Sequence, residues 1–274
     1  MSAESASVVR LAVVQLSSSD DIAANLEATR LFVGRAADQG AEFVALPENY
    51  GYLRREGLPY PCAQGVDGEI VGCIRELARE RGIWILGGSF PEAIANTDRV
   101  FNCSVLVSPQ GEPVARYRKL HLFDVELGHD GGSFRESDAI AAGDDVVCAE
   151  TPFGVLGMSI CYDLRFPELY RELVTRGARW VSVPSAFAPA TGRDHWEVLL
   201  RARAIENQVF VMAPAQCGQH SPDRSSYGRS MIVDPWGLVL AQAGDEPGVI
   251  VADCDLGRLE RVRAAIPCLQ NRRL

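Results

Sequence analysis

The sequence predicts an α/β fold in which two mixed β-sheets pack face to face and helices cover their outer sides, a four-layer α-β-β-α sandwich. Short β-rich runs alternate with segments of helical period along the N-terminal third of the chain. A faint internal repeat also divides the chain into two pseudo-equivalent halves. The predicted strands are 9–16, 42–47 and 83–90, and the predicted helices between them are 20–39 and 69–81.

The helix predicted over 20–39 has recognisable ends. Asp20 is a candidate N-terminal cap, because its carboxylate can accept a hydrogen bond from a backbone N–H of the first turn. Ile22, Leu26 and Phe32 give the segment an apolar side. Gly40 is expected to end the helix.

The internal repeat aligns residues 40–50 with residues 177–187. The two segments share Gly, Ala, Val and Pro in step, so Pro47 and Pro184 occupy equivalent positions. The residues just past these prolines are therefore expected at equivalent strand ends. Strand ends are where α/β folds place their chemistry.

A second match connects two predicted turns. Residues 103–107 are expected to turn through 108–111 into a return strand over 114–117. The segment 107–111 resembles 233–237, which is also followed by a return strand. Two matches in the same order favour related halves over chance.

Length and composition limit the class of protein. The 274 residues are 47% hydrophobic, which suits a large core, and we interpret 1–274 as a single domain. With 36 acidic and 27 basic residues the formal charge is -9, which would repel phosphate backbones, so no nucleic-acid partner is expected. Residues 1–7 lack the features of a secretion signal and no apolar stretch reaches membrane-spanning length, so a cytoplasmic protein without membrane contact is expected.

One of the eight cysteines lies where a nucleophile is expected. The eight are scattered without a C-x-x-C pair, which predicts free thiols rather than disulfides, and we interpret seven of them as structural. Cys161 lies between a buried strand predicted over 155–161 and a helix predicted over 166–176. A sharp turn there is expected to expose the sulfur, and the helix N-terminus is expected to favour the thiolate.

Three segments resemble the signature segments of the nitrilase (carbon-nitrogen hydrolase) superfamily, and they are 45–50, 117–124 and 157–168. The order and spacing of Glu48, Lys119 and Cys161 also match this superfamily. Four further segments look most like its deaminated glutathione amidase branch, close to the ω-amidase branch, and they are 184–187, 195–205, 215–218 and 227–237. The resemblance implies the α-β-β-α sandwich and a homodimer or larger homo-oligomer.

Amide hydrolysis requires an activated nucleophile, a group that holds the oxyanion and an acid for the leaving nitrogen. Cys161 is the expected nucleophile. Glu48 could take its proton, pass that proton to the leaving nitrogen and then activate water. Lys119 and the backbone N–H of Tyr162 could hold the oxyanion.

The resemblance also implies a second glutamate that orients Lys119 and the substrate amide. A Phe-x-Glu-Ser context maps this role onto Glu136. The preceding loop, with the glycine-rich segment 128–132, is about one residue longer than in many relatives. Glu126 is therefore the alternative for this role.

Residues that follow the second equivalent strand are expected to wall the substrate pocket. Phe187 and Thr191 are the candidates, and Trp196 either joins them or packs in the core. Residues 193–194, Arg-Asp, depart from the small or apolar pair common in this branch, which affects fine substrate choice.

Arg165, four residues after the nucleophile, has two interpretations. Its guanidinium could form a bidentate contact with a substrate carboxylate, or it could form a salt bridge with Asp163 or Glu168. The resemblance favours substrate binding, because the substrates of this branch are α-keto acid amides.

The predicted function is hydrolysis of a small carboxamide, an α-keto acid ω-amide such as deaminated glutathione, to the acid and ammonia through a cysteine thioester. Alternatives with the same catalytic residues are ω-amidase activity on α-ketoglutaramate, nitrile hydrolysis and N-carbamoyl cleavage. A catalytically silent scaffold and a thiol redox sensor are non-enzymatic alternatives.

Other hydrolase and nucleotide-binding classes lack their sequence patterns. His121 and His195 could serve a papain-like protease, but the cysteine signature of that class is absent, so both are expected to pack or form hydrogen bonds. Zinc-ligand spacings and phosphate-binding glycine loops are also absent, so neither a metal nor a cofactor is expected. Gly87 and Gly88 are expected at a turn or strand end.

Overall fold

The computed structural model describes residues 8–55, 57–127 and 132–273. The N-terminal segment 1–7 and most of the glycine-rich loop 128–132, both used in the sequence interpretation, lie outside the described residues.

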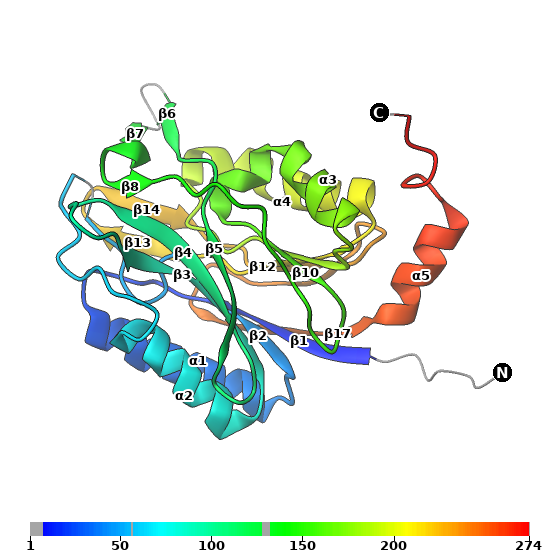
Figure 1. Ribbon diagram of the computed structural model, residues 1–274, viewed down its shortest axis with the longest axis horizontal. Helices are drawn as coiled ribbons and strands as arrows, with labels where there is room; N and C mark the ends of the chain where they lie inside the picture. The colour runs from blue at the N-terminus through cyan, green and yellow to red at the C-terminus, as the bar shows by residue number, and fades with distance from the viewer. Residues whose placement is uncertain (1–7, 56, 128–131, 274) are drawn as a thin grey trace.

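Two β-sheets form the centre of the molecule (Figure 1). The first has seven strands in the order β17-β1-β2-β3-β4-β5, with β8 paired to β4, and their bounds are β1 Val8–Gln15, β2 Phe43–Ala45, β3 Trp84–Ala93, β4 Val100–Val107, β5 Pro113–Arg118, β8 Ile140–Ala141 and β17 Gly248–Asp255. The second has the order β16-β15-β12-β11-β10-β9, and its bounds are β9 Cys148–Ala149, β10 Leu156–Met158, β11 Trp180–Ser182, β12 Phe210–Ala213, β15 Met231–Val233 and β16 Val239–Gln242. Two small hairpins pair β6 Asp124–Glu126 with β7 Ser133–Arg135, and β13 Cys217–Ser221 with β14 Arg224–Tyr227.

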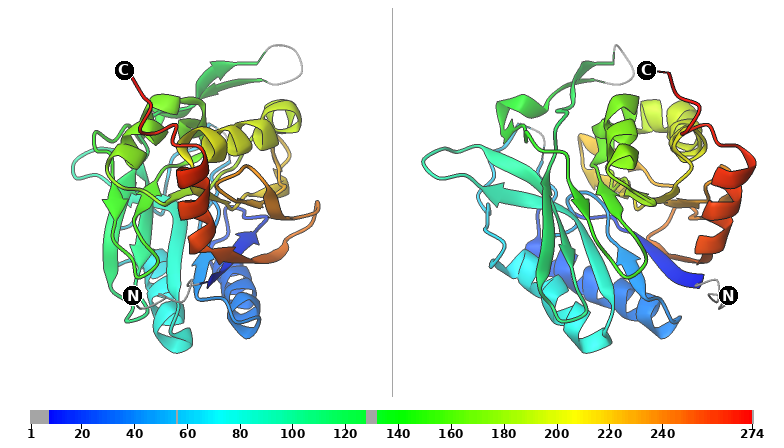
Figure 2. Two further views of the ribbon diagram at one scale, coloured as in Figure 1. Left: turned by 90° about the vertical axis from the view of Figure 1, so that its right-hand side faces the viewer. Right: turned by 45° about the vertical axis from the view of Figure 1, so that its right-hand side comes forward.

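Helices cover the outer faces of both sheets. α1 (Ile22–Asp38) and α2 (Glu69–Arg81) pack on the first sheet, and α3 (Pro167–Thr175) and α4 (Pro189–Asn207) pack on the second. Figure 2 shows the resulting four layers from two further sides, with α5 (Leu256–Ala265) at one end of the sandwich. The 3₁₀ helices η1 (Glu136–Asp138) and η2 (Cys161–Arg165) follow β7 and β10.

The two halves have the same strand connectivity, as the repeat predicted. β1, β2 and β3 are parallel and continue into the antiparallel β4 and β5. β10, β11 and β12 are likewise parallel and continue into the antiparallel β15 and β16.

The two matched turns also have the same hydrogen bonds. Ser108 Oγ accepts two backbone N–H groups across the β4–β5 turn, and Asp234 Oδ1 accepts two across the β15–β16 turn. Gly111 and Gly237 occupy equivalent positions at φ 77° and 85°, where a residue without Cβ is favoured.

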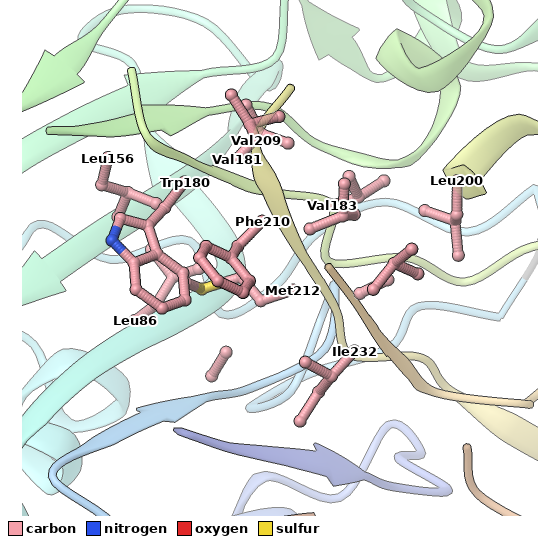
Figure 3. Close-up of a cluster of buried hydrophobic side chains, with 14 of the residues drawn as sticks. Leu86, Leu156, Trp180, Val181, Val183, Leu200, Val209, Phe210, Met212 and Ile232 are labelled. Carbon is pink, nitrogen blue, oxygen red and sulfur yellow. The ribbon is translucent and has the colours of Figure 1, made fainter. Parts of the chain in front are cut away.

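The period of two along the strands separates the two cores. On β1, Val9, Leu11 and Val13 face the second sheet, while Ala12 and Val14 face α1 and α2. The core between the sheets includes the stacked rings of Trp180 and Phe210, whose centroids are 4.6 Å apart, and Figure 3 shows them beside Leu86 of the first sheet.

Several local predictions require correction. The strand predicted over 155–161 ends at Met158, because the chain leaves the sheet to form η2. Asp21, rather than Asp20, caps α1 by accepting the N–H of Ala24 at 3.0 Å. Gly87 and Gly88 lie inside β3, at a register shift in its pairing with β4, rather than at a turn or strand end.

Gly88 allows β3 to approach the end of β2, and substitution there tests how tightly this region is packed. An added Cβ would lie 1.9 Å from the carbonyl oxygen of Pro47, so the backbone next to Glu48 would have to move. We expect Gly88→Ala to lower the free energy of unfolding by about 1–3 kcal/mol and to reduce activity. Urea denaturation measures the first effect.

Gly72→Ala is the matched control, because Gly72 lies within α2 and an added Cβ there meets nothing within 4 Å. This change should be neutral or should stabilise the helix by up to about 1 kcal/mol. Equal denaturation midpoints for Gly88→Ala and the unmodified chain would show that the approach of β3 to Pro47 is not constrained.

Candidate active site

The three residues expected to carry the chemistry meet at the ends of their strands. Glu48 follows β2, Lys119 directly follows β5, and Cys161 begins η2 after β10. Lys119 Nζ lies 3.2 Å from Glu48 Oε1, and the Cys161 thiol hydrogen-bonds to the Glu48 carboxylate. The cluster therefore joins the first half of the molecule to the second.

Glu48 is a buried carboxylate surrounded by donors. Asn102 Nδ2 donates to its Oε1 at 2.8 Å, and the backbone N–H of Ala186 donates to its Oε2 at 2.7 Å. Burial raises the pKa of Glu48, but the Lys119 ammonium and the hydrogen-bond donors outweigh burial and leave the pKa below its ordinary value. Glu48 is therefore ionised and can act as a base.

Lys119 lies between two carboxylates, and its side chain is 2% exposed. Its Nζ lies 3.0 and 2.9 Å from the two carboxylate oxygens of Glu136, in addition to its contact with Glu48. Burial lowers the pKa of Lys119, but Glu136 and Glu48 together raise it well above its ordinary value, so the amine stays protonated. Only one of the 27 basic residues in the sequence is a lysine, and it is this one.

The structure distinguishes the two candidates for the second glutamate. Glu136 begins η1, and its Oε2 also accepts the backbone N–H of Phe123 at 2.6 Å. Glu126 lies on β6 with a side chain that is 78% exposed and pairs with Arg135 at 3.7 Å. Glu136 is therefore the glutamate that contacts Lys119.

Cys161 occupies a strained position at the start of η2. Its φ is 50°, which is uncommon for a residue with a Cβ, and its N–H donates to the carbonyl of Pro184 at 2.9 Å. The sharp turn predicted from the sequence is therefore present. However, the residue is only 8% exposed, and its sulfur reaches solvent through the pocket it lines.

The expectation that the helix N-terminus favours a thiolate is wrong for this substrate-free site. Burial, and then the negative charge of Glu48, raise the pKa of the Cys161 thiol well above its ordinary value. These effects outweigh Lys119 and the N–H of Ala186, which act in the opposite direction. The Cys161 thiol is therefore neutral and lies beside the ionised Glu48 carboxylate. All eight cysteines are free, as the sequence predicted.

Asp163 fixes the turn that carries Cys161. This fully buried carboxylate accepts the hydroxyl of Tyr117 at 2.6 Å and the backbone N–H groups of His121 and Ile160 at 3.1 and 2.8 Å. His121 Nδ1 lies 2.7 Å from Asp163 Oδ1, and its ring stacks on Phe166. The predicted packing and hydrogen-bonding role of His121 is confirmed, whereas the sequence interpretation overlooked Asp163 as a positioning residue.

Cys161, Glu48 and Lys119 line a pocket of about 630 Å³, partly open to solvent, a size that suits a small molecule. Tyr162, Phe187 and Thr191 line it, as predicted, together with residues that were not predicted, namely Tyr60, Phe123, Phe134, Arg54 and Arg224. Tyr60, Arg54 and Arg224 lie outside the signature segments, whereas Phe123 lies within 117–124 and Phe134 begins the Phe-x-Glu-Ser context, so the motifs could have identified these two rings.

Two other predicted pocket residues lie elsewhere. The Arg165 guanidinium lies 5.3 Å from the ring centre of Phe187, and its Nη1 is 3.3 Å from His195 Nδ1, so it packs against the pocket wall instead of lining the pocket. Trp196 is fully buried and donates its Nε1–H to the carbonyl of Arg229 at 2.8 Å, which is the core-packing interpretation.

The described residues contain neither a cluster of metal ligands nor a membrane-spanning helix. Within 8–55, 57–127 and 132–273, no three His, Cys, Asp or Glu residues are grouped as metal ligands. In the same part of the chain no helix has both the length and the apolar character required to cross a bilayer.

Comparison with known proteins places this geometry among related sequences and structures. A family model described as carbon-nitrogen hydrolase matches residues 10–264. A deaminated glutathione amidase of Synechocystis sp. is 42% identical over 264 residues, which cover 95% of this chain and 97% of the relative.

Solved structures agree with this match. The crystal structure of the C. elegans NitFhit protein has a TM-score of 0.91 at 39% identity, over 97% of this chain and 65% of that longer chain. A variant of the Nesterenkonia sp. AN1 amidase has a TM-score of 0.78 at 28% identity, over 98% of this chain and 95% of that chain. Its structure shows the acetamide moiety of fluoroacetamide added covalently at the active-site cysteine. These similarities confirm the predicted four-layer fold.

The solitary lysine leads to a prediction about its replacement. We expect Lys119→Arg to lower kcat by about 100-fold or more, because a planar guanidinium cannot replace a single nitrogen that contacts both Glu48 and Glu136. Steady-state kinetics on an amide substrate, with circular dichroism to confirm folding, tests this expectation.

Arg118→Lys is the control, because Arg118 is the preceding residue but pairs with Glu92 away from the pocket. It should keep most of its turnover. Near-normal turnover in Lys119→Arg would mean that any buried cation is sufficient at this position.

Proposed function

Because the chain belongs to the carbon-nitrogen hydrolase family and is an amidase, we propose that it cleaves an α-keto acid amide through a thioester on Cys161, with deaminated glutathione as the candidate substrate. The observation that carries the proposal is the buried contact of three groups, the Cys161 thiol, the Glu48 carboxylate and the Lys119 ammonium. The amidases among the relatives support the reaction class.

The first half of the reaction forms the thioester. Glu48 takes the proton of the Cys161 thiol as the sulfur attacks the amide carbon, and the carbonyl π electrons move to oxygen. The Lys119 ammonium and the backbone N–H of Tyr162 hold this oxyanion. Glu48 then gives its proton to the amide nitrogen, the C–N bond breaks, and ammonia or an amine leaves.

The second half uses the same residues on water. Glu48 takes a proton from a water molecule, whose oxygen attacks the thioester carbon. Collapse of the second tetrahedral intermediate breaks the C–S bond, and the proton on Glu48 returns to the Cys161 sulfur. Glu136 contributes by holding Lys119 in its charged form between two carboxylates.

Two features of the site disfavour the non-enzymatic alternatives. A redox sensor needs an accessible thiol of low pKa, whereas the Cys161 thiol is buried and its pKa is raised. A silent scaffold would gain little from burying Lys119 with two carboxylates, because buried ion pairs contribute little net stability. ω-Amidase activity, nitrile hydrolysis and N-carbamoyl cleavage use the same groups and are distinguished by substrate.

We also propose that residues 1–274 form a single domain and that two copies of the chain form a homodimer in the cytoplasm. Exposed apolar residues support the dimer, since Ile205 of α4 lies beside Gly237 of the β15–β16 turn, and Val198, Ile205, Trp236 and Leu238 are each about half or more exposed. Light scattering should give twice the chain mass for the unmodified protein and a lower mass for Val198→Asp. Equal masses would exclude this interface, and cell fractionation tests the location.

The experiment that tests the function uses Cys161→Ala on a panel of ω-amides, nitriles and N-carbamoyl compounds. We expect the unmodified enzyme to prefer α-keto acid amides and Cys161→Ala to lose several orders of magnitude in kcat. Iodoacetamide should inactivate the enzyme by labelling Cys161, and Glu48→Gln should lower kcat by about 100-fold or more.

Cys148→Ala is the control, because Cys148 lies on β9 and outside the pocket, and it should keep its activity. Turnover that survives in Cys161→Ala would refute the thioester mechanism. Loss of activity with EDTA that zinc restores would instead indicate a metallohydrolase.

A further inference from the structure

A single carboxylate oxygen joins the segment that carries Lys119 to the turn that carries Cys161. Oδ2 of the fully buried Asp163 accepts the Tyr117 hydroxyl at 2.6 Å and the backbone N–H of Ile160 at 2.8 Å. Tyr117 lies on β5 two residues before Lys119, and Ile160 directly precedes Cys161. The supports of the ammonium and of the nucleophile therefore meet at one atom of a buried side chain.

The chain is held to this carboxylate on both sides of Lys119. The Tyr117 hydroxyl, besides donating to Asp163, accepts the backbone N–H of Leu120 at 3.2 Å. On the other side of the lysine, the backbone N–H of His121 donates to Asp163 Oδ1 at 3.1 Å. Because Lys119 lies inside this closed set of hydrogen bonds, its backbone position depends on Asp163.

The nucleophile turn depends on the same residue. The backbone N–H of Asp163 donates to the carbonyl of Ile160 at 3.1 Å, while its side chain accepts the N–H of Ile160, so the two residues close the start of η2 reciprocally. Cys161 lies inside this closed turn at a φ of 50°. Such a backbone conformation persists only when surrounding contacts hold it.

The hydroxyl of Tyr117 can be separated from its ring. The ring is fully buried in the core between the sheets, a packing role that phenylalanine would also fill. Burial, and then Asp163, raise the pKa of Tyr117 well above its ordinary value, so the hydroxyl keeps its proton and donates it to the carboxylate. The hydroxyl therefore contributes a hydrogen bond rather than a charge.

We propose that Tyr117 is a positioning residue, whose hydroxyl sets the location of the Lys119 ammonium relative to the Cys161 sulfur through Asp163. This inference rests on the proposed amidase function. Lys119 and Cys161 line the pocket, whereas Tyr117 packs in the core. In the proposed mechanism the sulfur attacks a carbonyl carbon while the ammonium holds its oxygen, so a shift between them slows attack more than it weakens substrate binding.

The test removes one hydroxyl and keeps the ring. In Tyr117→Phe, kcat for deaminated glutathione should fall about 10-fold or more while KM stays within about twofold, because the substrate still meets the same pocket wall. Tyr50→Phe is the matched control, because Tyr50 is equally buried and lies two residues from Glu48, but its hydroxyl donates to the carbonyl of Ile70 on α2 at 2.9 Å. Both variants should lose a similar amount of stability in urea, and only Tyr117→Phe should lose kcat.

A double variant tests the route through Asp163. Asp163→Asn replaces one acceptor oxygen by an NH2 group, so it should lower kcat at least as much as Tyr117→Phe does. Because the hydroxyl acts through this carboxylate, Tyr117→Phe combined with Asp163→Asn should lower kcat no further than Asp163→Asn alone. Additive losses would overturn the route. Where Asp163→Asn does not fold, the comparison of Tyr117→Phe with Tyr50→Phe decides the proposal.

Unchanged kcat in Tyr117→Phe, or an equal loss in Tyr50→Phe, would overturn the positioning role. A second measurement separates this failure from failure of the proposed function. If the unmodified enzyme hydrolyses no compound of the substrate panel, the proposed function fails. Slower alkylation of Cys161 by iodoacetamide in Tyr117→Phe than in Tyr50→Phe would then still support the positioning role, and equal or faster alkylation would overturn it as well.

Discussion

The Lys119 ammonium is buried between two carboxylates, and the rest of the site is arranged so that these three buried charges are stabilised. Transfer of an ion into a protein interior costs several kcal/mol unless opposite charges and hydrogen bonds surround it. Glu48 and Glu136 provide the opposite charges. Each carboxylate then needs donors of its own, and these come from Asn102, Ala186 and Phe123. The charges therefore fix the relative positions of β4, the ends of β2 and β5, η1 and the segment after β11.

The internal repeat explains how so many elements reach one point. Pro47 and Pro184 follow equivalent parallel strands, and the chain just past each of them faces the same pocket. The first half supplies the side chain of Glu48 there, and the second half supplies the backbone N–H of Ala186, which donates to that carboxylate at 2.7 Å. The carbonyl of Pro184 also accepts the N–H of Cys161. The two equivalent strand ends therefore differ in what they provide: a carboxylate that accepts hydrogen bonds after β2 and, after β11, a backbone N–H that donates to it and a carbonyl that accepts the N–H of Cys161.

Local patterns were sufficient to predict much of the fold. The β-rich run over 9–16 predicted β1, and the repeat predicted the shared connectivity and the matched turns. The pairing of β1 with β17 had no such signal, because it joins segments more than 230 residues apart, such as Val8 with Asp255. The helix α5 was missed because nothing in the repeat corresponds to it.

The site was predictable only where its residues belong to sequence motifs. Glu48, Lys119 and Cys161 were identified in this way, whereas the choice between Glu126 and Glu136 depended on the turn that places η1 beside Lys119. Arg54 and Arg224, which line the pocket, belong to no sequence motif. The protonation state of Cys161 was mispredicted, because burial and the charge of Glu48 outweigh the helix N-terminus.

The neutral resting thiol is consistent with chemistry among buried groups. At rest, Glu48 is ionised, Lys119 is protonated and Cys161 is neutral, so the charges of these three groups sum to zero beside the Glu136 carboxylate that contacts Lys119. In the proposed mechanism, proton transfer moves a negative charge from Glu48 to the sulfur, and attack moves it on to the substrate oxygen. No step creates a new pair of charges, which a low-dielectric site would oppose. The negative charge only moves among groups around the fixed Lys119 ammonium. Because this ammonium is already in place, the protein does not have to reorganise during the reaction.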